Sequence, residues 1–119
     1  MKTNIKFTNM KSSDKLRDYA ESKYESFSKL VAPEHLEDAV CNVELAHDAH
    51  HQNGDVCMTE VTLDVNGKVY RATKFEKKME KAIDKVKDDI LEALRTDKGK
   101  REDSKRKGAA QAKEMLRSE

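Results

Sequence analysis

The sequence feature that most constrains the fold is a regular apolar stripe between residues 79 and 94. Its members recur at steps of three and four residues: Met79, Ala82, Ile83, Val86, Ile90, Ala93 and Leu94. This spacing places them on one face of a helix with a period of 3.6 residues. A helix with one apolar face buries that face against another element. Residues 74–101 therefore predict one long helix, starting near Phe75, that docks on a sheet or on other helices.

Positive charge follows the same spacing on a different face of this predicted helix. Four lysines would stack there into a cationic ridge: Lys74, Lys78, Lys81 and Lys85. Beyond the apolar stripe the positive charge continues through Arg95, Lys98, Lys100 and Arg101. Such a ridge could face a polyanion. The alternative interpretation is a solvated helix face whose lysines keep the protein soluble.

The first third of the chain predicts a strand followed by a helix. Residues 3–9 alternate polar and apolar side chains, which is typical of a strand with one buried face. The hydroxyl of Ser12 or Ser13 can cap the free amides at the start of a helix. Apolar and aromatic residues then follow helical spacing over residues 16–31. Pro33 cannot continue that helix and is expected to begin a connecting loop.

The middle of the chain changes to the period of two that indicates strands. Three extended runs follow one another at residues 39–46, 56–65 and 69–73. A polar loop is expected at residues 47–55, between the first two runs. Asn66 and Gly67 join the last two runs, and this pair is the strongest short hairpin signal because both residues tolerate positive φ.

The predicted order is strand, helix, three strands, helix, which indicates an α+β fold. We expect a two-layer sandwich in which a four-stranded sheet carries both helices on one face. The three consecutive strands would form an antiparallel meander, and the first strand would join the same sheet. We assign residues 1–98 to this domain. Residues 99–119 are expected to form a basic C-terminal tail, flexible or partly helical, because Gly99 and Gly108 favour a break before it.

The composition narrows the class of protein. Charged residues make up 39% of the chain and aromatic residues 5%, so the core must be small and aliphatic. The net charge of +1 gives no global sign of a nucleic-acid partner. No apolar run reaches the roughly 20 residues of a membrane span, and the N-terminus lacks a signal-peptide pattern, so a cytoplasmic protein without a membrane partner is expected. Cys41 and Cys57 lack metal-site spacing and are expected to be buried thiols.

Other kinds of site find little support in the sequence. His47, His50 and His51 are the best metal candidates, but their spacing matches no recognised zinc site, and a solvated loop is the simpler interpretation. Neither a phosphate-binding glycine loop nor a nucleophile elbow is present, so we expect no enzyme and no cofactor. An adaptor that binds proteins, or a small metal-binding protein, remains the alternative to a protein that binds a polyanion.

Two groups of residues resemble the ribosome hibernation promoting factor family, which includes the ribosome-associated translation inhibitors. The first group runs from the hairpin into the last helix: Asp64, Val65, Asn66, Gly67, Ala72, Thr73, Met79, Ala82, Ile83 and Asp84. The second lies in the first helix: Leu16, Arg17, Tyr19, Lys23 and Tyr24. The resemblance covers roughly residues 3–95.

This resemblance implies a function. Family members bind the small ribosomal subunit in the groove where messenger and transfer RNA lie, and they hold idle ribosomes inactive. The implied partner is therefore 16S rRNA, not DNA, and the implied state off the ribosome is a monomer. The family uses basic side chains on both helices, and Arg17 and Lys23 match such positions. The chain departs from the family at Asp89 and Glu92, where cations are usual, and at Lys78, where an acidic residue is usual.

Overall fold

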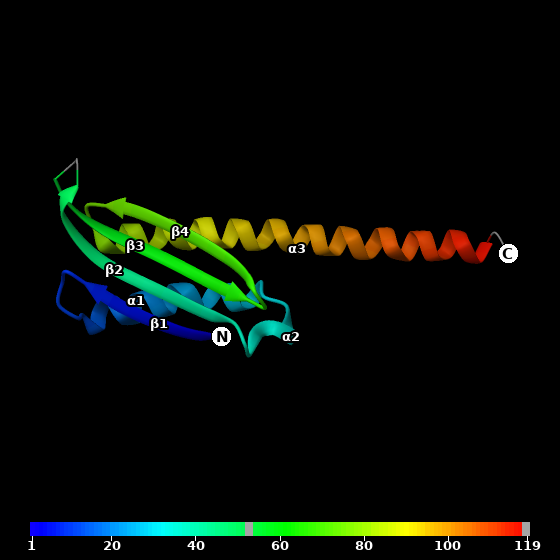
Figure 1. The fold of residues 1–119 in the computed structure, drawn as a ribbon, viewed down its shortest axis with the longest axis horizontal. Helices are drawn as coiled ribbons and strands as arrows, with labels where there is room; N and C mark the ends of the chain where they lie inside the picture. Colours follow the sequence, from blue (N-terminus) through cyan, green and yellow to red (C-terminus); the bar gives the residue numbers. More distant parts are fainter. Residues whose placement is uncertain (52–53, 118–119) are drawn as a thin grey trace.

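A four-stranded sheet with two long helices on one of its faces forms the body of the protein (Figure 1). The computed structural model describes residues 1–51 and 54–117, and the side chains of residues 1–49 and 54–99. The elements in chain order are β1 (Lys2–Thr8), α1 (Asp14–Tyr24), the 3₁₀ helix η1 (Glu25–Lys29), α2 (Pro33–Leu36), β2 (Val40–His51), β3 (Gly54–Val65), β4 (Lys68–Glu76) and α3 (Met79–Arg117). The long axis of the molecule measures 69 Å because α3 extends well beyond the sheet.

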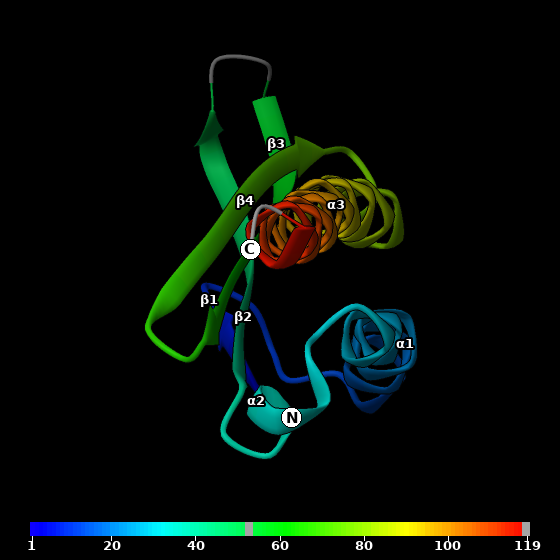
Figure 2. The same cartoon turned by 90° about the vertical axis from the view of Figure 1, so that its right-hand side faces the viewer.

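The sheet has the simple strand order β1-β2-β3-β4. Strand β1 pairs in parallel with β2, while β2, β3 and β4 form an antiparallel meander. A parallel pair needs a crossover connection, and α1 supplies it between β1 and β2. Figure 2 shows α1 and α3 on the same side of the sheet. The predicted α+β two-layer sandwich is therefore confirmed.

The core lies between the sheet and these two helices. Alternate residues of the two central strands point into it, among them Cys41, Val43 and Leu45 of β2 and Val61 and Leu63 of β3. The apolar stripe of α3 packs on them as predicted, and Ile83 and Val86 are fully buried. Helix α1 and η1 close the core with the stacked rings of Tyr24 and Phe27, whose centroids lie 5.1 Å apart.

The two cysteines differ in burial. Burial raises the pKa of the Cys41 thiol to about 12, so this cysteine is an inert packed thiol. Cys57 is only partly buried.

Two local signals in the sequence act as expected. The side chain of Ser13 accepts a hydrogen bond of 3.2 Å from the backbone amide of Leu16, which caps α1. Asn66 and Gly67 adopt φ angles of 51° and 85°, the positive values that the tight β3–β4 hairpin needs. The Gly67 amide also donates to Asp64 Oδ1 at 3.0 Å, which holds the turn closed.

Several predicted boundaries are wrong. Strand β2 continues to His51, so its last residues pair with β3 instead of forming a polar loop. The chain turns into η1 after Tyr24, and Pro33 begins the short helix α2, because proline is favoured at the first position of a helix. Helix α3 runs through Gly99 without the predicted break.

The most consequential error concerns the start of α3. Lys74 and Phe75 belong to β4, and the helix begins only at Met79. Residues 70–76 alternate between the two faces of the sheet, and the half-buried Ala72 and Lys74 face the helices. Lys74 fits the helical spacing of the later lysines only by coincidence, because four-residue steps are also even steps along a strand.

Replacing Ile83 with Asp should unfold the domain. The side chain is fully buried against the sheet, so the new carboxylate would be left without a partner at a cost of about 4 kcal/mol. Circular dichroism during thermal unfolding measures the change, and Glu92→Asp at an exposed position of the same helix is the control. A variant that melts at the wild-type temperature would contradict the observed helix register.

Truncation after Arg101 should leave the domain folded. The last buried residue of α3 in the described part of the chain is Leu94, so the removed segment contributes nothing described to the core. We expect the helical circular dichroism signal to fall while the melting temperature changes by less than about 4 °C, the shift that roughly 1 kcal/mol produces. A larger drop would show that the C-terminal segment packs on the domain.

Candidate nucleic-acid interface

The two helices are fixed to each other by hydrogen bonds that cross between them. Tyr19 of α1 donates its hydroxyl to the carboxylate of Asp84 on α3, at 2.8 Å and 3.0 Å to the two oxygens. One turn further along α1, the buried hydroxyl of Tyr24 donates to the backbone carbonyl of Ile83 at 3.1 Å. These bonds set the spacing of α1 and α3, so basic side chains on the two helices keep a defined separation.

Lys23 lies at the seam between the helices. Its ammonium group is 3.9 Å from Asp84 and 5.3 Å from the centre of the Tyr19 ring. The hydrogen bond to Asp84 raises the pKa of Tyr19, with burial as the second cause, so the phenol remains a donor at neutral pH. The Lys23 side chain is 38% exposed and can still reach a ligand above the seam.

Arg17 points to the other side of α1. Its guanidinium lies over the ring of Phe7 in β1, 5.5 Å from the ring centre. The Arg17 Nε atom is buried and has no hydrogen-bond partner among the described residues. The sequence predicted that Arg17 and the lysines of α3 converge on one surface. The structure instead holds Arg17 against Phe7, away from those lysines.

The predicted ridge of four lysines does not form as one free surface. Lys74, on β4, pairs with Asp89 of α3 at 3.4 Å. Lys85, on α3, pairs with Glu76 of β4. Both cations are thus used to join the edge strand to the helix. The Lys85 hydrogen bond lowers the pKa of Glu76, so this carboxylate is ionised at neutral pH and the pair persists there.

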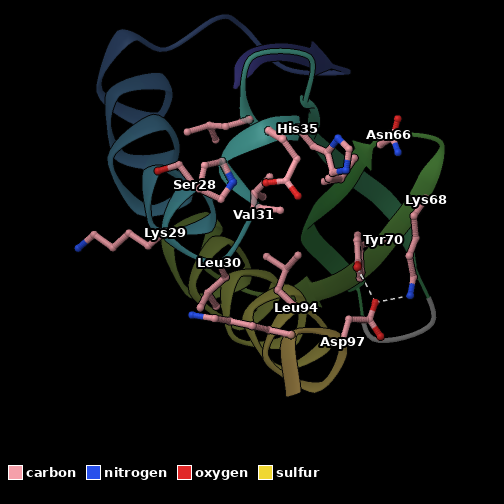
Figure 3. Close-up of a pocket in the computed structure, with 16 residues that line it drawn as sticks. Ser28, Lys29, Leu30, Val31, His35, Asn66, Lys68, Tyr70, Leu94 and Asp97 are labelled. Atoms are coloured by element: carbon pink, nitrogen blue, oxygen red, sulfur yellow. Dashed lines mark hydrogen bonds and ion pairs between the residues drawn. The ribbon is translucent and has the colours of Figure 1, made fainter. Parts of the chain in front are cut away.

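A third contact joins β4 to α3 near the start of β4. Asp97 of α3 accepts a hydrogen bond from the Tyr70 hydroxyl and pairs with Lys68 (Figure 3). These residues border a hollow of about 850 Å³ whose floor includes the buried side chains of Val31 and Leu94. The hollow marks the place where α3 leaves the sheet.

Lys87 of α3 pairs with its neighbour Asp88 at 3.9 Å and is only 24% exposed. Four further cations on α3 or just before it are exposed. Lys78 stands just before the helix, Lys81 lies in its first turn, and Arg95 and Lys98 lie further along. Within the described part of the chain, none of these four takes part in an ion pair. Exposed Asp88 and Glu92 separate the two pairs. The side chains of Lys100 and Arg101 lie outside the described residues.

Lys77 is an exposed cation that the sequence reasoning missed. It precedes Lys78 in the turn between β4 and α3. Lys77, Lys78 and Lys81 together form what we call the α3-start cluster, at the end of the helix where the macrodipole is also positive. Two adjacent lysines directly before a helix could have predicted this cluster from the sequence. The prediction was missed because the start of the helix was placed too early.

The predicted metal candidates are not assembled into a site by the described residues. His47 lies on β2 opposite Cys57 of β3. No group of three potential ligands occurs within the described residues. The side chains of His50 and His51 lie outside them.

The sequence model of a known family matches almost the whole chain. It is described as sigma 54 modulation protein / S30EA ribosomal protein, and it matches residues 3–102. The chain belongs to this family. Membership makes it a ribosome-associated protein and confirms that it is not an enzyme. A search of curated proteins found no match.

Solved structures of other proteins share this fold. The N-terminal domain of Protein Y from Thermus thermophilus matches with a TM-score of 0.63 at 18% identity, over 79% of this chain and 96% of that chain. A ribosomal subunit interface protein from Coxiella burnetii matches with a TM-score of 0.60 at 15% identity, over 80% of this chain and 97% of that one. At such low identity these matches show the shared fold alone.

Among the described residues, no helix is both long enough and apolar enough to cross a bilayer. Helix α3 has the length, but charged residues occur throughout it.

Replacing Tyr19 with Phe should loosen the two helices by about 1 kcal/mol, because the Asp84 carboxylate loses a hydrogen-bond donor. The stability of Tyr19→Phe, Asp84→Ala and the double variant, measured by urea unfolding, gives the coupling between the two side chains. Ser22→Ala, at an exposed position of α1, serves as the control. Strictly additive effects would mean that this hydrogen bond does not join the helices in solution.

Proposed function

We propose that the protein binds the small ribosomal subunit through its helix layer and occludes the groove where messenger and transfer RNA lie. It would thereby hold idle ribosomes inactive, acting in the cytoplasm and as a monomer off the ribosome. Membership of the S30EA family supports a ribosomal partner. The name of the structurally similar Coxiella protein, a ribosomal subunit interface protein, supports a position between the subunits.

The single observation that carries the RNA contact is the α3-start cluster. Its three lysines are exposed, adjacent and without carboxylate partners among the described residues. Lysines of this kind can each neutralise a phosphate and release the counterions that surround RNA. A lysine that already pairs with a carboxylate must first lose that partner, so it contributes less. Lys78 and Lys81 therefore rank above Lys74 and Lys85 as 16S rRNA contacts.

The other candidate residues divide in the same way. Arg95 and Lys98 are exposed and have no carboxylate partner among the described residues, so they rank with the α3-start cluster. Lys23 is 38% exposed but pairs with Asp84, so it ranks with Lys74 and Lys85. Arg17 is held against Phe7, and we assign it a smaller contribution. Lys100 and Arg101 would extend the basic surface along α3 by their place in the sequence. Binding of this kind recognises the shape and backbone of folded RNA and needs no catalytic group or cofactor.

The proposal predicts that the affinity for small subunits falls steeply with salt concentration, and that removing lysines makes this fall less steep. Replacing Lys78 and Lys81 with Gln should weaken binding to purified small subunits and reduce the slope of log affinity against log salt by about two units. Fold stability should hardly change, because exposed lysines contribute little to it. Sedimentation of the protein with subunits at several salt concentrations measures both the affinity and the slope.

The matched control removes two lysines from the other side of the sheet. Lys2 and Lys6 are exposed on β1, on the face that carries no helix. The Lys2→Gln, Lys6→Gln variant has the same net charge as the test variant but should keep the wild-type slope. Equal losses in the two variants would show that only net charge matters. A protein that does not sediment with small subunits at all would favour the adaptor function instead.

A further inference from the structure

Helix α3 continues far past the sheet on which it packs. Leu94 is its last buried residue in the described part of the chain, yet the helix ends only at Arg117. Figure 1 shows this second half of α3 extending beyond the sheet and the other helices. We call residues 98–117 the helical arm. At 1.5 Å per residue the arm is roughly 30 Å long, a large share of the 69 Å long axis of the molecule.

The direction of the helical arm is fixed at its base. Asp97, the residue before the arm, accepts a hydrogen bond from the Tyr70 hydroxyl and pairs with Lys68, both on β4 (Figure 3). Leu94, almost one turn earlier, is 3% exposed and packs in the core. An apolar and a polar contact within one turn of each other therefore set the axis along which the arm leaves the domain.

The positive excess of the chain lies in the helical arm. Its 20 residues include eight Lys or Arg and three Asp or Glu, a net charge of +5. Residues 1–97 hold 16 Lys or Arg and 19 Asp or Glu, a net charge of −3. The arm therefore supplies a long-range attraction to a polyanion that the net charge of the remaining chain does not provide.

The first half of the helical arm has no apolar residue with which to pack on a protein. Residues 98–108 consist of Gly, Ser and charged residues alone. They include three consecutive cations, Lys105, Arg106 and Lys107, whose positions a helix spaces about 100° apart around its axis. Positive charge distributed in this way has no single docking face. It suits the phosphates of a nucleic acid, which attract cations without requiring an apolar contact.

Helix α3 also joins the helical arm to the α3-start cluster. The helix is continuous from Met79 through Gly99 to Arg117. Met79 and Lys105 are 26 positions apart, which corresponds to roughly 39 Å along the helix axis. The two basic regions are thus held at a fixed separation, and a partner that contacts both must offer negative charge at two places this far apart.

We propose that the helical arm is a second RNA-binding element, which α3 holds at a fixed distance from the α3-start cluster. The inference rests on the proposed function only in taking ribosomal RNA as the RNA. Phosphates along a folded RNA complement the charge of the arm. Because one rigid helix connects the two regions, the first contact brings the second region close to the same RNA and raises the overall affinity.

Charge removal tests the contact itself. The probe is a fluorescent RNA duplex longer than α3, and its binding to the full chain is followed by anisotropy at several salt concentrations. Replacing Lys105, Arg106 and Lys107 with Gln should reduce the slope of log affinity against log salt by about two to three units. The matched control removes three exposed cations from the sheet face without helices and should keep the wild-type slope; these are Lys2, Lys6 and Arg71, each replaced with Gln.

Substitutions at Gly99 test the continuity of the helix without changing its charge. A Cβ atom at this position meets no atom within 4 Å, so Gly99→Ala preserves the helix. Gly99→Pro removes a helix hydrogen bond and kinks the chain. A kink of about 20° moves positions 105–107 by roughly 3 Å or more. We expect Gly99→Pro to bind the duplex at least about threefold more weakly than Gly99→Ala, while thermal unfolding shows that both domains are folded.

Three results would overturn the proposal. The triple Gln variant could keep the wild-type salt slope, or Gly99→Pro could bind the duplex as tightly as Gly99→Ala. The full chain could also bind phosphatidylglycerol vesicles more tightly than the RNA duplex, which would assign the same cations to a lipid surface. The ribosomal function fails separately: a chain that binds the duplex through its arm, but does not sediment with small subunits, would contradict that function and retain this inference.

Discussion

The docking of the apolar face of α3 on the sheet is the interaction on which the rest of the structure depends. Ile83, Val86 and Ile90 are buried almost completely where α3 lies against β3 and β4. This packing fixes the rotation of α3 about its axis. The rotation in turn decides which charged residues meet β4, which meet α1 and which stay in solvent. The electrostatic surface of the helix layer is thus a consequence of how the core packs.

That rotation also explains which partner Asp89 of α3 finds. Asp89 meets Lys74 of the edge strand at 3.4 Å. Glu76 and Lys85 form a second pair one helical turn away, with the charges reversed. Such exposed pairs contribute little to stability, typically below about 1 kcal/mol each. Their larger effect is to neutralise two lysines and to concentrate the available positive charge at the α3-start cluster.

The sequence predicted the layers of the fold but not every boundary. Long stripes and the Asn66–Gly67 turn are strong local signals, and they gave the correct element order. The start of α3 was misplaced because Lys74 satisfies both the helical and the strand period. Lys78 and Lys81 of the α3-start cluster were identified from the sequence, but Lys77 was missed. The pairing of Lys74 with Asp89 could not be predicted, because it depends on how a strand lies beside a helix. The function was inferred through the family resemblance, which the match over residues 3–102 supports.

The two faces of the sheet have opposite chemistry, and this follows from the same alternation of side chains. Odd-numbered residues of β2 point into the core, so its even-numbered residues, including Glu44 and Ala46, are left on the open face. The helix layer then presents most of the accessible lysines, while the open face presents a carboxylate pair beside an apolar row. Lys2, Lys6 and Arg71 are also exposed on the open face, so its charge is mixed. RNA bound to the helix layer, as proposed, would leave the other face of the sheet outside the contact, because the alternation of side chains along the strands separates the two faces.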